Sequence, residues 1–151
     1  MDAEHRQVLL ELGREILERQ PFSVLVGAEL EAVEPGHAVL ALPITERLQQ
    51  QLGFVHGGVI AYLADNALTW AGGTAMRVPV ITSEFKINYL RPAVGERLVA
   101  RADAVHVGRT QAVCRCDVAV VGADGSEKLC AVAQGTIVKM GEAPPASTAK
   151  G

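Results

Sequence analysis

One apolar segment, residues 54–73, restricts the possible folds of this chain more than any other feature. Apolar side chains recur in it with the spacing of one helical stripe, made by Val59, Ile60, Leu63, Ala64, Ala67, Leu68 and Ala71. We expect a helix that opens at His56-Gly57-Gly58 and ends at Gly72-Gly73. A helix this apolar has to be enclosed. Because the segments after it have the pattern of strands, a sheet is predicted to enclose it.

The remaining segments predict one α+β domain, with an antiparallel sheet wrapped around the central helix. Residues 2–20 should form an amphipathic helix, which Pro21 ends because a helix avoids the residue before proline. Its apolar side consists of Val8, Leu9, Leu12, Ile16 and Leu17. Strands are expected at residues 24–33, 37–44, 81–90, 97–107, 110–121 and 129–140. The chain is thus divided into an N-terminal helix (1–20), a main domain (21–140) and a disordered tail (141–151).

The strand patterns also predict which side chains meet the central helix. In strand 81–90, alternation puts one set on the same face: Ile81, Ser83, Phe85, Ile87 and Tyr89. Small side chains occupy alternate positions in two later strands, at Ala100, Ala102, Ala104, Ala131, Ala133 and Gly135. Since small side chains let a sheet come close to a helix, we expect this second set to face it.

Composition and charge exclude several classes of protein. With 49% hydrophobic and 21% charged residues the chain is globular, and a net charge of −3 gives no sign of a nucleic-acid-binding surface. Asp65, Asn66 and four glycines in the apolar segment argue against a membrane span, and the N-terminus lacks the pattern of a signal peptide. Neither disulfide nor zinc spacing is present at Cys114, Cys116 and Cys130. We therefore expect a cytoplasmic protein with buried reduced thiols and no metal.

The start of the central helix has features that can hold a carbonyl oxygen. The first N–H groups of a helix have no intrahelical acceptor, and the helix dipole makes this end electropositive. Gly57 and Gly58 would let a ligand approach the backbone closely, so that a bound carbonyl could become an oxyanion there. The alternative interpretation is that these glycines only shape a loop.

Asp65 is the second candidate, because a carboxylate among apolar residues is costly to bury without a partner or a task. The alternative is that it lies on a solvated stripe or pairs with a cation. Gly57 and Asp65 are eight residues apart, about 12 Å at about 1.5 Å per residue, whereas catalytic contacts need about 3 Å. If both act on one bond, they must come from two subunits, with antiparallel helices across a two-fold axis.

Three motifs resemble those of the phenylacetate-degradation (PaaI-type) branch of the hotdog-fold acyl-CoA thioesterases. They lie at residues 53–58 (GFVHGG), 64–67 (ADNA) and 88–93 (NYLRPA), and the resemblance extends over about residues 21–138. It implies a hotdog fold, in which the sheet wraps the helix, a homodimer that is commonly paired into a homotetramer, and hydrolysis of acyl-CoA without a cofactor.

The resemblance also assigns roles to particular residues. The backbone N–H of Gly57, with His56 shaping the turn, would polarise the thioester carbonyl, and Asp65 of the other subunit would be the general base or the nucleophile. Thr82 would help to orient the water, or Ser83 would if the strand register differs by one. Gln50 stands where family members often carry an Asn that holds substrate or water.

For the CoA portion, the resemblance points to the turn at Gly108, Arg109 and Thr110, where the family tends to place a basic residue near the nucleotide. Arg91 is a second candidate. A solvated hairpin arginine is the alternative interpretation of Arg109.

Two other functions fit the same sequence. A noncatalytic acyl-CoA-binding module would use the same fold but would have no use for a carboxylate aimed at the thioester. A hotdog dehydratase would usually need a histidine acid/base beside the carboxylate, and His56 is better interpreted as part of the turn. The acyl group, aryl or short- to medium-chain, is left open.

Overall fold

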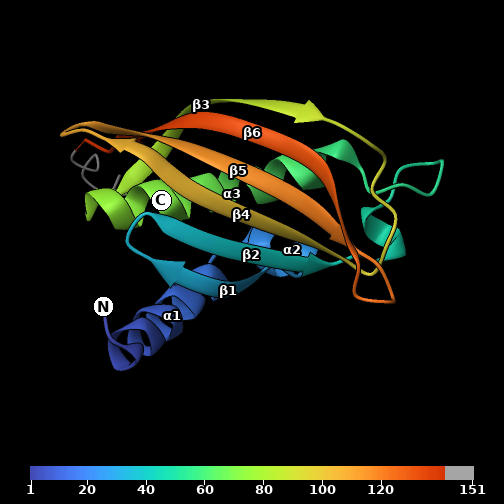
Figure 1. Ribbon diagram of the computed structural model, residues 1–151, viewed down its shortest axis with the longest axis horizontal. Coiled ribbons are helices and arrows are strands. Elements are labelled where there is room, and N and C mark those ends of the chain that lie inside the picture. The colour runs from blue at the N-terminus through green and yellow to red at the C-terminus, as the bar shows by residue number, and fades with distance from the viewer. Residues whose placement is uncertain (142–151) are drawn as a thin grey trace, which may run out of the picture.

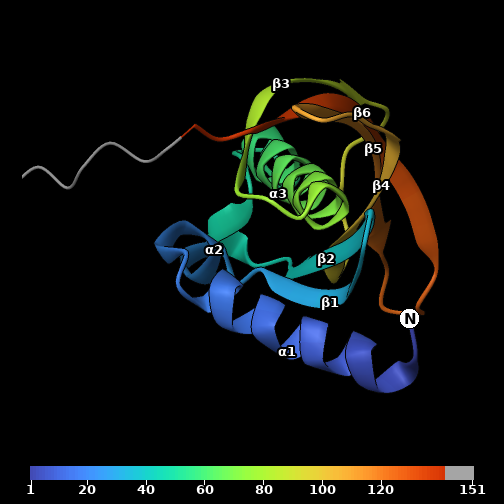
Figure 2. The same cartoon turned by 90° about the vertical axis from the view of Figure 1, so that its left-hand side faces the viewer.

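Helix α3 (Gly57–Met76) lies inside a curled antiparallel sheet, as the resemblance to hotdog proteins implied (Figures 1 and 2). The computed structural model describes residues 1–141, so most of the predicted tail, residues 142–151, lies outside the described residues. The six strands follow the order β1-β2-β4-β5-β6-β3. The other elements are α1 (Ala3–Glu18), α2 (Pro21–Val26), β1 (Glu29–Glu34), β2 (His37–Pro43), the short 3-10 helix η1 (Glu46–Leu48), β3 (Val80–Tyr89), β4 (Arg97–Val107), β5 (Gln111–Val121) and β6 (Glu127–Lys139).

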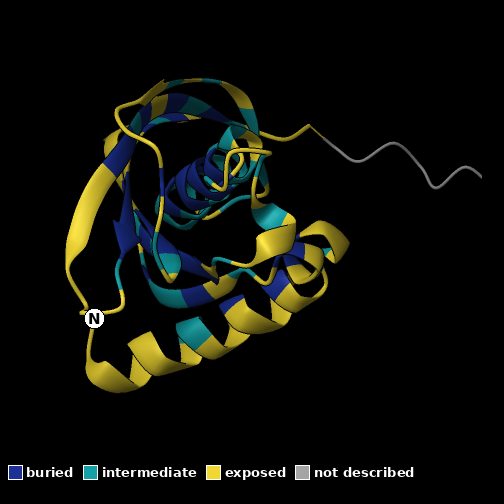
Figure 3. Ribbon diagram, turned by 90° about the vertical axis from the view of Figure 1, so that its right-hand side faces the viewer, coloured by how far each residue is buried: buried dark blue, intermediate teal, exposed yellow. Residues whose placement is uncertain are grey.

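The predicted apolar stripe of α3 forms the centre of the core. Its residues Ile60, Leu63, Ala64, Ala67, Leu68 and Ala71 are buried. They pack against the inner face of the sheet, where Ala100, Ala102, Ala131 and Ala133 are also buried. In Figure 3 the enclosed helix is mostly dark blue, whereas α1 is mostly yellow. Within residues 1–141, no helix is both long and apolar enough to cross a membrane.

The prediction that Gly72-Gly73 ends this helix was wrong. The helix continues to Met76 and ends at Arg77, which has the left-handed conformation (φ 55°) and donates its N–H to the Gly73 carbonyl. Gly72 instead marks a close approach, since a Cβ there would lie 2.8 Å from the Cβ of Ile137 in β6. Glycine is needed at this position for packing, and sequence alone does not distinguish that from a stop signal.

The predicted strand 24–33 was wrong over its first half. Residues Pro21–Val26 form α2, because Pro21 starts a helix at its first turn as readily as it ends the previous one. Gly27, with φ 78°, closes α2, and β1 begins only at Glu29. The hairpin turn at Pro35-Gly36 is as predicted, with φ 84° at Gly36.

The apolar side predicted for the first helix is divided in two. Gly13 and Leu17 are buried, and Leu9 packs against the core, but Val8, Leu12 and Ile16 are exposed on the flank of α1. A bare Cα at Gly13 brings α1 close to the body, since a Cβ there would lie 2.5 Å from the Leu30 side chain. The side of α1 that contacts the rest of the protein is therefore made by Leu9, Gly13 and Leu17, each one position after the exposed Val8, Leu12 and Ile16.

The face predicted for strand β3 was also wrong at one end, because a bulge interrupts its pairing with β6. Thr82 pairs with Ile137 and Glu84 with Thr136, which leaves Ser83 as an extra residue. Val80 and Thr82 thereby share the inner side with Phe85 and Ile87, whereas Ile81 and Ser83 are exposed. Because the bulge adds one residue at Ser83, the side chains before it face the opposite way from the one that strict alternation predicts.

The three cysteines are free and buried, in agreement with the sequence prediction of buried thiols. Burial is the main cause that raises the pKa of the Cys116 thiol to about 12 and that of Cys114 to about 11, and the nearby carboxylate of Asp103 adds to both. These thiols are neutral packing groups of the core.

The close approach at Gly72 yields a test of the packing. Helix propensity alone would make Gly72→Ala stabilising by about 1 kcal/mol. Because the added methyl would meet Cβ and both γ carbons of Ile137 at 2.8–2.9 Å, we expect a net loss of about 1–3 kcal/mol in the free energy of unfolding.

Chemical denaturation of the variant and wild type measures this difference. Gly73→Ala is the matched control, since its methyl would meet only one methyl of Val80, at 3.0 Å, and its stability should lie within about 0.5 kcal/mol of wild type. A Gly72→Ala protein as stable as wild type would contradict the packing described here.

Candidate active site

The turn before α3 presents the helix N-terminus in a fixed conformation. The His56 N–H donates to the carbonyl of Leu48 (2.8 Å), and the Val55 N–H donates to that of Ala93 (3.1 Å). As the N-cap, His56 accepts the Gly58 N–H on its ring Nδ1 at 2.9 Å, which puts the proton of the neutral imidazole on Nε2. His56 therefore shapes the turn, the role that the resemblance implied.

This cap leaves the Gly57 N–H available to a ligand. In the structure of residues 1–141 it donates to no acceptor, since the cap takes up only the neighbouring Gly58 N–H. Gly57 lies at the first helical position, where the dipole adds positive potential. One donor of the kind that stabilises an oxyanion is thus presented at the helix start.

Tyr89 is a neighbour of this turn to which sequence reasoning gave no role. Its hydroxyl donates to the Gly57 carbonyl (2.7 Å), and a Cβ on Gly57 would lie 3.3 Å from its ring. The end of β3 is thereby joined to the start of α3. The only signal in the sequence was the position of Tyr89 within the motif at residues 88–93.

The Asp65 carboxylate accepts a hydrogen bond from one hydroxyl group of the edge strand, and a hydroxyl group of its own helix lies beside that donor. The Thr82 hydroxyl donates to Oδ1 of Asp65 (2.6 Å) and lies 2.9 Å from the hydroxyl of Thr69. Thr69 also donates to the Asp65 carbonyl (2.9 Å). The carboxylate is half-buried, on the side of α3 that the sheet does not cover. Sequence reasoning gave Thr69 no role, although it lies one turn after Asp65.

The same geometry distinguishes the two hydroxyls considered for strand β3. The bulge turns Thr82 toward Asp65 and leaves Ser83 exposed on the opposite side. Gln50 is directed into its own loop, where its side-chain oxygen accepts the N–H of Leu52. The structure therefore brings Thr82 to the carboxylate, and it brings neither Ser83 nor Gln50 there.

The residues considered for CoA lie at two ends of the sheet. Arg91 is exposed just after β3, at the Tyr89 end where Gly57 lies. Arg109 is exposed in a turn closed by the Gly108 N–H on the Gln111 carbonyl (2.8 Å), with Thr110 accepting from Lys139 (2.9 Å). Because Lys139 pairs with Val80, this turn is at the other end of β3, roughly 30 Å away for 10 residues.

The fold and these residues define a class, the hotdog proteins whose long helix begins at a His-Gly-Gly turn and carries one carboxylate. The model of the thioesterase superfamily matches residues 52–122. A relative, 1,4-dihydroxy-2-naphthoyl-CoA hydrolase of Listeria monocytogenes, is 31% identical over 114 residues, which cover 74% of this chain and 89% of the relative. Other curated relatives are called putative esterases or medium/long-chain acyl-CoA thioesterases.

Solved structures agree with this assignment. A thioesterase family protein from Silicibacter pomeroyi has a TM-score of 0.80 and 35% identity, covering 85% of this chain and 96% of that one. A mutant of the phenylacetic acid degradation protein PaaI from Thermus thermophilus has a TM-score of 0.70 and 30% identity, covering 80% and 100%. The chain belongs to the thioesterase superfamily, and its resemblance to the PaaI-type branch is confirmed.

The contact between Thr82 and Asp65 predicts the effect of removing one hydroxyl. Thr82→Val keeps the shape of the side chain but deletes a hydrogen bond to a carboxylate, typically about 1.5–3 kcal/mol. We expect kcat for thioester hydrolysis to fall about 10- to 100-fold. Thiol release at saturating acyl-CoA measures it.

Ser83→Ala is the control, because it deletes the adjacent hydroxyl that points away from Asp65. Its kcat should stay within about twofold of wild type. Equal losses in both variants would show that the hydrogen bond to Asp65 has no special part.

Proposed function

We propose that this protein hydrolyses acyl-CoA thioesters to a free acid and CoA, at a site shared by two subunits. The hydrogen bond from Thr82 to Asp65 is the observation that carries the proposal. It orients the single carboxylate of α3, on the side of the helix that the sheet does not cover. The Gly57 N–H at the start of the same helix supplies the complementary oxyanion donor.

The chemistry follows from these two groups. The Gly57 N–H donates to the thioester carbonyl oxygen, while Asp65 takes a proton from water as its oxygen attacks the carbonyl carbon. The tetrahedral intermediate then collapses, the C–S bond breaks, and the proton passes to the CoA thiolate. In a second route the Asp65 carboxylate attacks the carbonyl carbon first and the C–S bond breaks, which releases the CoA thiolate to be protonated, and water then hydrolyses the mixed anhydride to the acid and the free Asp65 carboxylate. Both routes consume one water and yield the acid and CoA.

The two-subunit site rests on distance. Gly57 and Asp65 lie on one straight helix, about 12 Å apart along its axis, so one carbonyl cannot touch both. A two-fold axis that sets two α3 helices antiparallel would bring Asp65 of one protomer to Gly57 of its partner. The same operation brings the far turn at Arg109 to the partner's site, where a guanidinium suits a CoA phosphate.

The sheet edges support the same arrangement. At one edge, β1 is covered by α1, and Arg14 donates to the Leu30 carbonyl (3.0 Å). At the other edge, β3 pairs on one side only, with β6, and Ile81 and Tyr89 are exposed along it. An open edge of 10 residues is a ready template for pairing with a second copy.

The outer face of the sheet and the three cysteines bear on assembly and on location. A homotetramer would pair two such dimers through the outer face of the sheet, where Val105 and Leu129 are exposed. A cytoplasmic location fits the three buried free thiols, which a reducing compartment preserves.

Subunit complementation tests the shared site. Asp65→Asn removes the base, and Gly57→Pro removes the N–H at a helix position where proline is favoured, after a residue with φ −59° and ψ 132° that suits a following proline. Each variant alone should lose about 10²–10⁴-fold in kcat.

When equal amounts of the two variants are unfolded together and refolded, half of the dimers should be mixed and carry one intact site. Thiol release should recover to about a quarter of wild type. No recovery from two folded variants that form mixed dimers would place both groups in one protomer. Full activity of Asp65→Asn would show that another residue carries the chemistry.

Arg109→Ala tests the proposed phosphate contact. Because the guanidinium would bind a part of CoA remote from the thioester, we expect KM for acyl-CoA to rise about 5- to 50-fold with kcat unchanged. The matched control is an acyl-pantetheine substrate, which lacks the nucleotide. Wild type and Arg109→Ala should hydrolyse it with the same kcat/KM. A lower kcat at constant KM would argue against this role.

A further inference from the structure

The oxyanion donor proposed at Gly57 lies in the most permissive part of its helix. Two glycines in succession, Gly57 and Gly58, occupy the first two positions of α3. Glycine has the widest choice of backbone conformation, and the first N–H groups of a helix have no intrahelical acceptor to hold them. A donor stabilises an oxyanion best when it already points to where the charge develops. Contacts from outside the helix therefore have to fix the direction of the Gly57 N–H.

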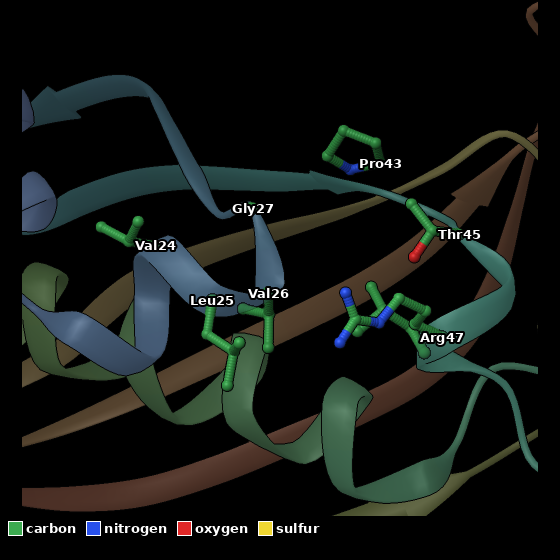
Figure 4. Close-up of a pocket in the computed structure, with 8 residues that line it drawn as sticks. Val24, Leu25, Val26, Gly27, Pro43, Thr45 and Arg47 are labelled. Carbon is green, nitrogen blue, oxygen red and sulfur yellow. The ribbon is translucent and has the colours of Figure 1, made fainter.

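On one side the turn is supported by the short helix η1. The Leu48 carbonyl accepts the His56 N–H (2.8 Å). Leu48 also lines a groove of about 420 Å³ between α2, the end of β2 and η1, and Figure 4 shows Leu25 and Arg47 among the other side chains that line it. Leu25 is 71% exposed, so the groove is open to solvent. Support from this side thus comes from the border of an open groove, and it ends at His56.

On the other side lies the end of β3, and its backbone is fixed by the sheet. Tyr89, the last residue of β3, pairs with Ala131 of β6, which is fully buried. The next N–H, that of Leu90, donates to the Cys130 carbonyl (2.9 Å). A contact from Tyr89 to the turn therefore starts from a backbone that the sheet holds in place.

The hydroxyl of Tyr89 acts on the peptide group that follows the proposed donor. It donates to the Gly57 carbonyl oxygen (2.7 Å), while the N–H of the same peptide group, from Gly58, donates to the ring of His56 (2.9 Å). Because a peptide group is planar, these two contacts fix its orientation. The peptide group before it is held at the His56 carbonyl by the Val59 N–H (2.9 Å). With both neighbouring peptide groups held, the direction of the Gly57 N–H is fixed.

We propose that Tyr89 is a positioning residue, whose hydroxyl holds the Gly57 N–H in the direction that the thioester carbonyl oxygen requires. The inference rests on the proposed function and adds a residue that acts on the reaction through Gly57. The side chain is 52% exposed, so water is an equally good partner for its hydroxyl and the hydrogen bond adds little to the stability of the fold. Its main consequence is the local one, at the start of α3.

Tyr89→Phe tests this role, because it deletes the hydroxyl and keeps the ring against Gly57. We expect kcat for thioester hydrolysis to fall about 5- to 30-fold, less than the loss of a whole oxyanion donor, since the N–H is still present but less well directed. KM should stay within about twofold, because the oxyanion forms only in the transition state. Thiol release over a range of acyl-CoA concentrations measures both.

Thr74→Val is the matched control. The Thr74 hydroxyl also joins α3 to another element by a bond to a carbonyl, that of Glu34 (3.0 Å), but at the opposite end of the helix from Gly57. Its deletion should lower the Tm at least as much as Tyr89→Phe does and leave kcat within about twofold of wild type. A merely structural role for Tyr89 would give the same pattern in both variants.

A spectroscopic measurement reads the position of the donor without turnover. In an Asp65→Asn background, phenylacetyl- and hexanoyl-CoA labelled with ¹³C at the thioester carbonyl are bound, and the infrared band of this carbonyl is recorded. A hydrogen bond from Gly57 should shift the band to lower frequency. Tyr89→Phe should reduce this shift, and Thr74→Val should leave it unchanged. A shift of this kind, with no hydrolysis by wild type, would refute the proposed function and support the role of Tyr89.

Several results would overturn the inference and leave hydrolysis intact. They are a Tyr89→Phe enzyme with the kcat of wild type, a change in KM alone, an equal loss of kcat in Thr74→Val, and a carbonyl band that does not shift on binding or is the same with and without the hydroxyl. Because Tyr89 lies on the open edge of β3, sedimentation compares the assembly of the variants with that of wild type. A Tyr89→Phe protein that assembles differently would assign the residue to subunit pairing instead.

Discussion

Enclosure of α3 by the sheet is the constraint on which the rest of the structure depends. The helix is apolar around most of its circumference, so its burial supplies much of the driving force for folding, and the alanines of β4 and β6 let the sheet come close enough to bury it. A sheet of six strands does not close around the helix. One stripe of α3 is left uncovered, and that stripe carries Tyr62, Asp65, Asn66 and Thr69. The polar side chains of α3 are therefore confined to the side that the sheet leaves uncovered, because the opposite side is packed against the sheet.

The uncovered stripe and the open edge strand are consequences of the same geometry. Because β3 is the last strand of the sheet, its inward-facing Thr82 reaches the uncovered side of α3 and contacts Asp65. At its other end, Tyr89 contacts the Gly57 turn. The strand that would pair with a second subunit is thus the strand that orients both proposed reacting groups. In the proposed dimer, pairing of the subunits and positioning of the site would therefore be coupled.

The sequence was sufficient for the start and the buried face of the central helix, for five of the strands and for the turn at His56, since these follow from periodicity, turn chemistry and motif, whereas the role of Asp65 stays a prediction. It failed where one residue type has two uses. Gly72 allows a close contact with Ile137 and does not end a helix, and Pro21 starts α2 after α1 has ended. The bulge at Ser83, which turns Thr82 toward Asp65, depends on pairing with β6 and has no local signal. Thr69 and Tyr89 gained their place in the site only through contacts across the fold.

Side-chain hydrogen bonds join the N-terminal helices to the central helix. Ser23, Gln20, Tyr62 and Asn66 form a part-buried network that fastens the junction of α1 and α2 to α3, on the side of the helix that also carries Asp65. The proposed reacting groups lie on α3, whereas Ile16 lies on the exposed flank of α1. Side chains on that flank contribute little to the core, so they can change without cost to the fold. The geometry proposed for hydrolysis is therefore independent of the side chains on the exposed flank of the first helix.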